Sequence, residues 1–287
     1  RFRTLEEKHG SLIKGMLASR RMRPAPPKPD APTPARPQSV FMSLQGGMNE
    51  LIDTLVDQLT GDLCLSTKVE SLAAQDDGYR LRLADGAEVQ AQSVVLAIPA
   101  YIAAELMRSF APAAANQLEQ IRYVSTGTIS LAFRRDEIDN PLNGFGVVIP
   151  RSEGRLINAV TWTSTKFNQR APDDAVLLRA FFGGSRHPEM MDHDDAALLA
   201  IVRRELVELL GIRATPLFHR IFRWHRANPQ YDVGHLDRVD AVEAALPTGL
   251  FVTGSPYRGV GIPDCVHQAQ TTAAAVAAHT QPVKMPA

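Results

Sequence analysis

Hydrophobic positions recur every three or four residues in four stretches of the chain, which is typical of helices that pack by one face. These stretches are residues 5–22, 49–59, 194–210 and 264–279. The first places Leu12, Ile13, Met16 and Leu17 on a single face, and the last is rich in alanine. The pattern therefore predicts four helices that are far apart in the sequence.

Alternating apolar and polar residues predict short strands between the helices. Residues 64–72 alternate loosely and residues 79–83 strictly, and the Asp85-Gly86 pair that follows predicts a hairpin through a type I′ turn, which requires positive φ. Residues 93–99 are apolar at consecutive positions, which is typical of a strand buried on both faces in a sheet covered by helices. A second short apolar strand is expected at residues 250–254.

The pattern changes after Phe110, where strands follow one another without intervening helices. Turns are expected at Asn140-Pro141 and at Gly154. The predicted strands cover residues 124–133, 144–150, 156–163 and 176–182, followed by a strand pair within residues 217–224. This region is therefore predicted to form a mainly antiparallel sheet with one helix.

Residues 24–37 contain seven of the 20 prolines in the chain. Proline lacks an amide donor and fixes φ, so these residues cannot form a helix or a central strand. We interpret them as an extended or disordered linker, and a ligand for a proline-recognition domain is the alternative interpretation. In either case they mark a boundary in the organisation of the protein.

The composition is that of an ordinary globular protein. The chain has 287 residues, 31 basic and 31 acidic side chains and 45% apolar residues, so it has neither the net charge of a nucleic-acid-binding protein nor an apolar run that would span a membrane. The two cysteines, Cys64 and Cys265, cannot form a disulfide framework and are expected as free thiols in a reducing compartment. We expect a cytoplasmic protein.

The neutral total conceals a basic N-terminal part. Residues 1–37 contain nine Lys or Arg and three Asp or Glu, a net charge of +6. The predicted helix in this part fits peripheral contact with an anionic membrane surface. It equally fits a solvated helix packed by one face, because basic residues also favour helix C-termini.

The richest candidate for chemistry is the sequence from Gly254 to Cys265, which is predicted to run from a strand through a glycine loop into a helix. Gly254, Gly259 and Gly261 would let the backbone approach a ligand, and the unpaired amides at the start of the helix carry partial positive charge. The pattern fits an anionic or electron-rich ligand at Gly261-Ile262. A tight strand-to-helix connection without a ligand is the alternative.

Other clusters of polar residues give weaker evidence of a functional site. His187, Asp192, His193, Asp194 and Asp195 lie close in sequence, but the spacing matches no metal-ligand motif, and the aspartates are explained as caps of the helix at 194–210. No metal site is predicted. The sequence has no Gly-x-Ser-x-Gly motif, and Trp224 beside His225 fits either a core position or the wall of a cofactor site.

Together these segments resemble the FAD-dependent protoporphyrinogen and coproporphyrinogen oxidase family, within the amine-oxidase-like flavoproteins. The resemblance covers about residues 5–279, with the segments in the same order. They are Gly46-Gly47-Met48, Thr67-Lys68-Val69, residues 94–99, residues 144–150, Thr161-Trp162-Thr163, Arg223-Trp224-His225, Pro229-Gln230-Tyr231, Gly234-His235 and residues 254–265.

The resemblance implies an α/β fold, in which a partial doubly wound FAD-binding domain carries an inserted, mainly antiparallel substrate domain. Residues 1–23 would be the tail of a helical, membrane-facing domain, residues 38–107 and 241–287 parts of the FAD domain, and residues 108–240 the substrate domain. The implied activity is oxidation of a porphyrinogen to a porphyrin in haem biosynthesis, with molecular oxygen as the final acceptor.

The resemblance also assigns residues to FAD. Val69 would contact the adenine end through its backbone, and Trp224 would lie against the flavin region. Val260, Gly261 and Ile262 would meet the flavin ring and its polar edge, where amides stabilise negative charge on the reduced ring. Gly254 joins this set through the glycine loop. No catalytic acid or base is implied, because catalysis would depend on the placement of the flavin.

The sequence departs from the family at one motif. The Gly-x-Gly-x-x-Gly turn that holds the FAD pyrophosphate is absent, and the chain begins at Arg1. We therefore expect a fragment that binds FAD poorly on its own. Coproporphyrinogen and protoporphyrinogen both stay open as substrates, with the composition favouring the soluble coproporphyrinogen type, and the oligomeric state is not predicted. Another amine-oxidase-like enzyme, such as an amine oxidase or a carotenoid desaturase, and a non-catalytic interaction protein are the alternatives.

Overall fold

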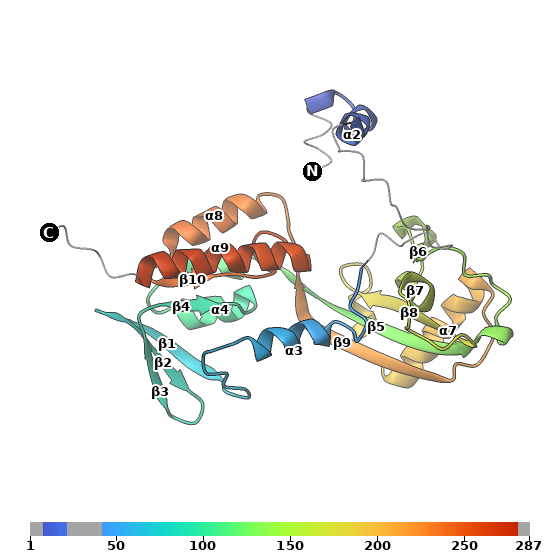
Figure 1. The fold of residues 1–287 in the computed structure, drawn as a ribbon, viewed down its shortest axis with the longest axis horizontal. Helices are drawn as coiled ribbons and strands as arrows, with labels where there is room; N and C mark the ends of the chain where they lie inside the picture. Colours follow the sequence, from blue (N-terminus) through green and yellow to red (C-terminus); the bar gives the residue numbers. More distant parts are fainter. Residues whose placement is uncertain (1–7, 22–41, 281–287) are drawn as a thin grey trace, which may run out of the picture. The chain divides into compact units, whose positions relative to one another are not determined.

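The computed structural model describes residues 8–21 and 42–280 of the chain (Figure 1). Two compact units are present, Arg1–Val40 and Phe41–Ala287, and each is treated by itself. In the first unit, helix α2 spans Leu12–Arg21, which confirms the centre of the helix predicted at 5–22. The outer residues of that prediction and the whole proline-rich segment lie outside the described residues. None of the described helices is long and apolar enough to cross a membrane.

The largest sheet of the second unit has five strands in the order β6-β7-β8-β5-β9, and all neighbouring strands are antiparallel. Helix α7, Asp195–Leu210, supplies Leu198, Val202 and Leu206 to the core on one face of this sheet. The strands are β5 (Tyr123–Arg134), β6 (Gly146–Val148), β7 (Ile157–Trp162), β8 (Ala175–Gly183) and β9 (Phe218–Pro229). The antiparallel sheet predicted after Phe110 is therefore confirmed.

The prediction of a strand pair within 217–224 is wrong, because β9 is a single strand of 12 residues. It runs along β5, from Ala132 opposite Phe218 to Tyr123 opposite Pro229. A turn within 217–224 would have removed these ladder hydrogen bonds. The predicted turn at Gly154 is confirmed, since this residue ends a short 3₁₀ helix, Arg151–Glu153, with φ of +61°.

A second core lies around two parallel strands, β4 (Val94–Leu96) and β10 (Leu250–Val252). Helices α4 (Ala100–Met107), α5 (Pro112–Glu119) and α8 (His235–Ala245) bury small side chains against it. The expectation that β4 is buried on both faces is wrong, because Val95 is 42% exposed while its neighbours Val94 and Leu96 are buried. In the described chain, helices thus cover one face of this strand more fully than the other.

Three strands form a separate antiparallel meander, β1 (Val69–Gln75), β2 (Gly78–Leu83) and β3 (Glu88–Ala91). The hairpin predicted at Asp85-Gly86 is confirmed, but its type I′ turn is not. Only Gly86 has positive φ, and Leu83 donates its amide to the carbonyl of Ala87 across a three-residue loop. Strand β1 begins five residues later than the strand predicted at 64–72.

The remaining helices are α3 (Asn49–Asp57), α6 (Thr163–Lys166) and α9 (Ile262–Thr280). Two further 3₁₀ turns, Arg135–Glu137 and Pro188–Met191, flank strands of the large sheet. Helices α3, α7 and α9 confirm the predictions for residues 49–59, 194–210 and 264–279. The predicted fold class, α/β with an antiparallel sheet, is confirmed, and the limits of the predicted domains remain a prediction.

Candidate functional site

The predicted strand–glycine loop–helix unit is present. Strand β10 ends at Val252, the loop follows, and α9 begins at Ile262, two residues earlier than predicted. Gly254 and Gly259 have φ of +109° and +148°, values that side chains with a Cβ rarely adopt. The amide of Cys265 donates to the carbonyl of Gly261 at 2.9 Å, the first hydrogen bond of the helix.

Two of the glycines are required by Asp264, whose side chain folds back over the loop. A Cβ on Gly259 would lie 2.5 Å from the Cβ of Asp264, and a Cβ on Gly261 would lie 2.9 Å from its carboxylate. Real Cβ atoms do not approach other heavy atoms this closely. Gly259 and Gly261 therefore make room for a side chain of the same unit, and the approach of the loop to a ligand stays a prediction.

The start of α9 carries amides that helix geometry leaves without an intrahelical acceptor. They belong to Gly261, Ile262 and Asp264, since Pro263 has none. The apolar side chains of Val260 and Ile262 beside them are more than half exposed. This combination of partial positive charge and accessible apolar surface suits a flat ring with an electron-rich edge.

Tyr231, which precedes the glycine loop in sequence, forms hydrogen bonds to it. Its hydroxyl donates to the carbonyl of Ser255 at 2.8 Å and accepts from the amide of Gly259 at 2.7 Å, so that one group joins both ends of the loop. Its ring stacks on His235, with centroids 3.8 Å apart. Partial burial raises the pKa of the Tyr231 phenol, the first of its causes, so the hydroxyl stays protonated and able to donate.

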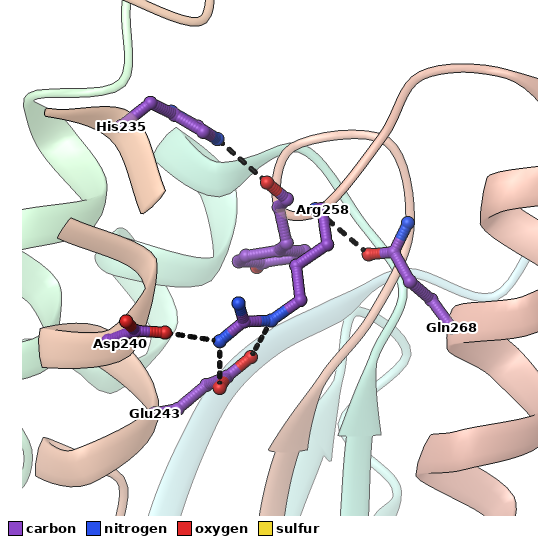
Figure 2. Close-up of polar contacts among 6 residues, drawn as sticks. His235, Asp240, Glu243, Arg258 and Gln268 are labelled. Carbon is purple, nitrogen blue, oxygen red and sulfur yellow. Dashed lines mark hydrogen bonds and ion pairs between the residues drawn. The ribbon is translucent and has the colours of Figure 1, made fainter. Parts of the chain in front are cut away.

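His235, at the start of α8, anchors the middle of the loop. Its Nε2 lies 2.7 Å from the carbonyl oxygen of Tyr257, and because a carbonyl only accepts, Nε2 carries the proton (Figure 2). Both side chains are almost completely buried. Burial is also the main reason why the pKa of Tyr257 is strongly raised.

Arg258 ties the loop to two helices. Figure 2 shows its guanidinium directed at Glu243 and Asp240 of α8, with bonds of 2.5 Å and 3.0 Å to the first and 2.6 Å to the second. These bonds, that to Glu243 foremost, raise the pKa of the guanidinium. The backbone amide of Arg258 donates to Gln268 of α9 at 3.1 Å. The loop therefore has a defined conformation between α8 and α9.

Trp224 lies on β9 and is 45% exposed, so it is not a core residue of the described chain. It stacks on Phe222 with centroids 5.9 Å apart. The strand bulges just after it, where Arg226 has φ of +45°. The amide of Arg226 donates to the hydroxyl of Ser125 at 2.9 Å, and its guanidinium lies 4.0 Å from the ring centroid of Tyr101, which together hold this strained conformation.

The structure brings four of the six predicted cofactor residues together. Gly254, Val260, Gly261 and Ile262 share the loop and the helix start, and Tyr231, which follows the last residue of β9, forms hydrogen bonds to this loop. Val69 opens β1 opposite Leu83, so it lies in the three-stranded meander rather than in the loop. The assignment of these residues to FAD stays a prediction.

Sequence reasoning did not assign roles to Tyr231, His235 and Arg258. The first two lie in segments that carry the resemblance, Pro229-Gln230-Tyr231 and Gly234-His235. Their partners are 22 to 28 residues away, beyond the range of periodicity or capping patterns. The local signal available in the sequence was an aromatic residue four positions before a histidine, Tyr231 and His235, whose rings stack in the structure.

Of the aspartates near 192–195, Asp194 acts as the predicted cap. Asp194 caps α7, accepting from the amide of Ala197 at 2.7 Å, and Asp195 pairs with Arg223 of β9 at 2.6 Å. Across residues 8–21 and 42–280, no group of three or more His, Cys, Asp or Glu side chains is arranged to hold a metal ion.

A parallel strand pair, a glycine loop at an open helix start and an adjoining antiparallel sheet are features of flavoprotein oxidoreductases. The chain belongs to the family described as flavin containing amine oxidoreductase, which it matches over residues 2–277. The flavin cofactor and the oxidoreductase class predicted from the sequence are thereby confirmed for the family.

Comparison with individual relatives gives a more specific result than the family match. The chain is 40% identical to a coproporphyrinogen III oxidase of Propionibacterium freudenreichii subsp. freudenreichii, over 82% of this chain and 44% of the relative. It is 32% identical to the chloroplastic protoporphyrinogen oxidase of Nicotiana tabacum, over 95% of this chain and 53% of the relative. A crystal structure of an assigned protoporphyrinogen oxidase from Exiguobacterium sp. 255-15 aligns with a TM-score of 0.78 at 30% identity, over 96% of this chain and 57% of that one.

These relatives confirm the resemblance to protoporphyrinogen and coproporphyrinogen oxidases. The chain spans about half the length of the curated relatives it matches. The residues at the start of α9 fit a flavin ring, because the amides of Gly261, Ile262 and Asp264 have no intrahelical acceptor and lie beside two exposed apolar side chains. These three residues would hold the ring. The sequence contains no Gly-x-Gly-x-x-Gly turn, the motif that holds the pyrophosphate of FAD.

Proposed function

We propose that this chain serves an FAD-dependent oxidation of a porphyrinogen, coproporphyrinogen III or protoporphyrinogen IX, to the corresponding porphyrin. The observation that carries the proposal is the match to both kinds of porphyrinogen oxidase at 32% to 40% identity over most of the chain. The glycine loop and the open start of α9 support it, because both lie within the matched residues.

The residues of this chain would act by positioning the flavin ring. When bound, FAD supplies the centre that accepts a hydride from the macrocycle, and molecular oxygen is the final acceptor in the proposed reaction. The amides of Gly261 and Ile262 would stabilise negative charge at the polar edge of the ring. Val260 and Ile262 would cover its apolar part, while Tyr231, His235 and Arg258 keep the loop in the required conformation.

The test is an aerobic assay with the flavin-loaded protein. Porphyrinogens are supplied in parallel with a primary amine such as putrescine, and porphyrin fluorescence, hydrogen peroxide and flavin absorbance are followed. We expect porphyrin to accumulate faster than in flavin-free controls, without amine oxidation. Amine oxidation without porphyrin formation would replace the proposal with the amine-oxidase alternative. Because we expect this chain to bind FAD poorly on its own, the non-catalytic alternative is favoured only if a longer protein that also carries a Gly-x-Gly-x-x-Gly turn takes up no flavin.

The proposal includes a cytoplasmic location with peripheral membrane contact. Helix α2 supports the second part, because Ile13, Met16 and Leu17 are each more than half exposed on the face predicted to be apolar. Sedimentation with vesicles that contain phosphatidylserine tests it. We expect binding that falls at high salt, as basic residues near an anionic surface require.

A further inference from the structure

Asp264 is the third residue of α9, and its side chain folds back over the glycine loop. One of its carboxylate oxygens lies 2.8 Å from the place where a Cβ on Gly259 would be, and 2.9 Å from the place of a Cβ on Gly261. Because both residues are glycines, the carboxylate can occupy this space. A carboxylate therefore lies against the turn that presents the amides of Gly261 and Ile262.

This carboxylate has no cationic partner. Within the part of the chain that the structure describes, no side-chain nitrogen of Lys, Arg or His lies within 4.0 Å of it. Arg258 of the same loop is paired with Asp240 and Glu243 of α8 instead. Asp264 is exposed, and an exposed carboxylate is ionised at neutral pH. The start of α9 thus combines the partial positive charge of its amides with one uncompensated negative charge.

Gln268, one turn further along α9, joins the loop to the start of the helix. Its side-chain oxygen accepts from the backbone amide of Arg258 at 3.1 Å (Figure 2). Its side-chain nitrogen donates to the carbonyls of Gly259 and Asp264 at 3.3 Å and 3.2 Å. The charge of Asp264 also acts on a neighbouring group, since burial is the main cause that raises the pKa of the Tyr231 phenol and this charge raises it further.

We propose that Asp264 sets the reduction potential of the bound flavin, because its charge weakens the binding of reduced flavin relative to oxidised flavin. The inference rests on the proposed flavin-dependent oxidation. A hydride brings two electrons and one proton to a ring that is uncharged when oxidised, so the reduced ring carries a negative charge. The amides of Gly261 and Ile262 attract this charge, and the carboxylate of Asp264 repels it.

The repulsion favours the return of the two electrons to molecular oxygen. Oxygen takes these electrons with one proton from the ring and one from water, and it leaves as hydrogen peroxide. A lower reduction potential makes this transfer more favourable. Asp264 therefore suits a flavin site whose final acceptor is oxygen.

The test compares the affinities of the protein for oxidised and reduced FAD. Equilibrium dialysis of the 287-residue protein against FAD under air, and against dithionite-reduced FAD under argon, gives the two dissociation constants. We expect Asp264→Asn, which removes the charge and keeps the size, to strengthen binding of reduced FAD about tenfold relative to oxidised FAD. For a two-electron couple this ratio corresponds to a rise in potential of about 30 mV. Asp264→Glu keeps the charge and should leave the ratio close to that of the wild-type protein.

Asp237→Asn is the matched control, because Asp237 is the exposed third residue of α8. A carboxylate in the first turn stabilises any helix, so both asparagine variants should lose similar thermal stability. Only Asp264→Asn should change the ratio of affinities, and high salt should reduce its difference from the wild-type protein. An unchanged ratio in Asp264→Asn, or an equal change in Asp237→Asn, would overturn the inference.

The same substitutions are also measured in a longer protein that carries a Gly-x-Gly-x-x-Gly turn, so that weak binding of FAD by this chain does not decide the result. There the midpoint potential of the bound flavin is measured directly against a reference dye. Porphyrinogen oxidation with a potential that Asp264→Asn leaves unchanged would reject only the role of Asp264. A raised potential in a protein that oxidises no porphyrinogen would reject only the proposed function, and a longer protein that takes up no flavin would reject both.

Discussion

At the scale of single residues, the glycine loop depends on the space beside Asp264. Replacing Gly259 with alanine puts a Cβ 2.5 Å from the Cβ of Asp264, in a backbone with φ of +148°. We expect a loss of about 1–3 kcal/mol in the free energy of unfolding, because both the strain and the clash must be relieved. Urea denaturation measures this loss. Gly61→Ala is the control, since Gly61 has open space and ordinary φ, and an equal effect there would contradict the explanation.

Tyr231 permits a second residue-scale prediction. Tyr231→Phe removes the hydroxyl that bridges Ser255 and Gly259 and keeps the ring that stacks on His235. We expect stability to fall by about 1–2 kcal/mol, the net value of two hydrogen bonds, and flavin affinity to fall with it. Flavin fluorescence titration gives the second quantity. Tyr101→Phe, which loses a 3.3 Å bond to Arg226, should leave flavin affinity close to that of the wild-type protein.

At the scale of elements, α7 begins where the aspartate cluster predicts. Asp194→Ala removes the side chain that accepts from the amide of Ala197, and such caps contribute about 1 kcal/mol. Asp192→Ala is the matched control, because Asp192 precedes the cap and accepts no helix amide in the described contacts. Thermal melts of the two variants, with and without added zinc, distinguish the cap from a metal site. A zinc-dependent shift that either substitution abolishes would contradict the capping explanation.

Elements with strong periodicity were predictable, and short ones were not. The alternation along β2 and the hydrophobic faces of α3 and α7 were visible in sequence because each extends over several turns or repeats. Helices α4 and α5 have eight residues each and are rich in alanine, so neither produces a distinct apolar stripe. The length of β9 depends on its ladder to β5, a non-local constraint that no local pattern contains.

The candidate site was likewise predictable from the sequence only in part. The glycines and the start of α9 followed from local chemistry, since a strand, three glycines and a helix are adjacent in sequence. The contacts of Arg258 with Asp240 and Glu243 join residues 15 to 18 positions apart, and those of Tyr231 with Ser255 and Gly259 join residues 24 and 28 positions apart. Such groupings appear only when the chain has folded.

At the scale of the whole molecule, apolar surface is unevenly distributed between cores and exposed faces. Helix α3 has no buried residue, and its apolar residues Ile52 and Leu55 are each more than half exposed. A patch of this kind binds apolar dyes and promotes association. We therefore expect the 287-residue protein to bind the dye ANS in its native state and to show a sedimentation coefficient that rises with concentration.

Two leucine-to-alanine substitutions make this expectation quantitative. Leu55→Ala removes an exposed side chain of α3, so the free energy of unfolding should change by less than about 0.5 kcal/mol while native ANS fluorescence and association both decrease. Leu72→Ala removes a side chain of β1 that is 3% exposed, which should cost about 2–5 kcal/mol and increase ANS binding as packing loosens. If Leu55→Ala destabilised the protein as strongly as Leu72→Ala, the face of α3 would be packed in solution rather than open to solvent.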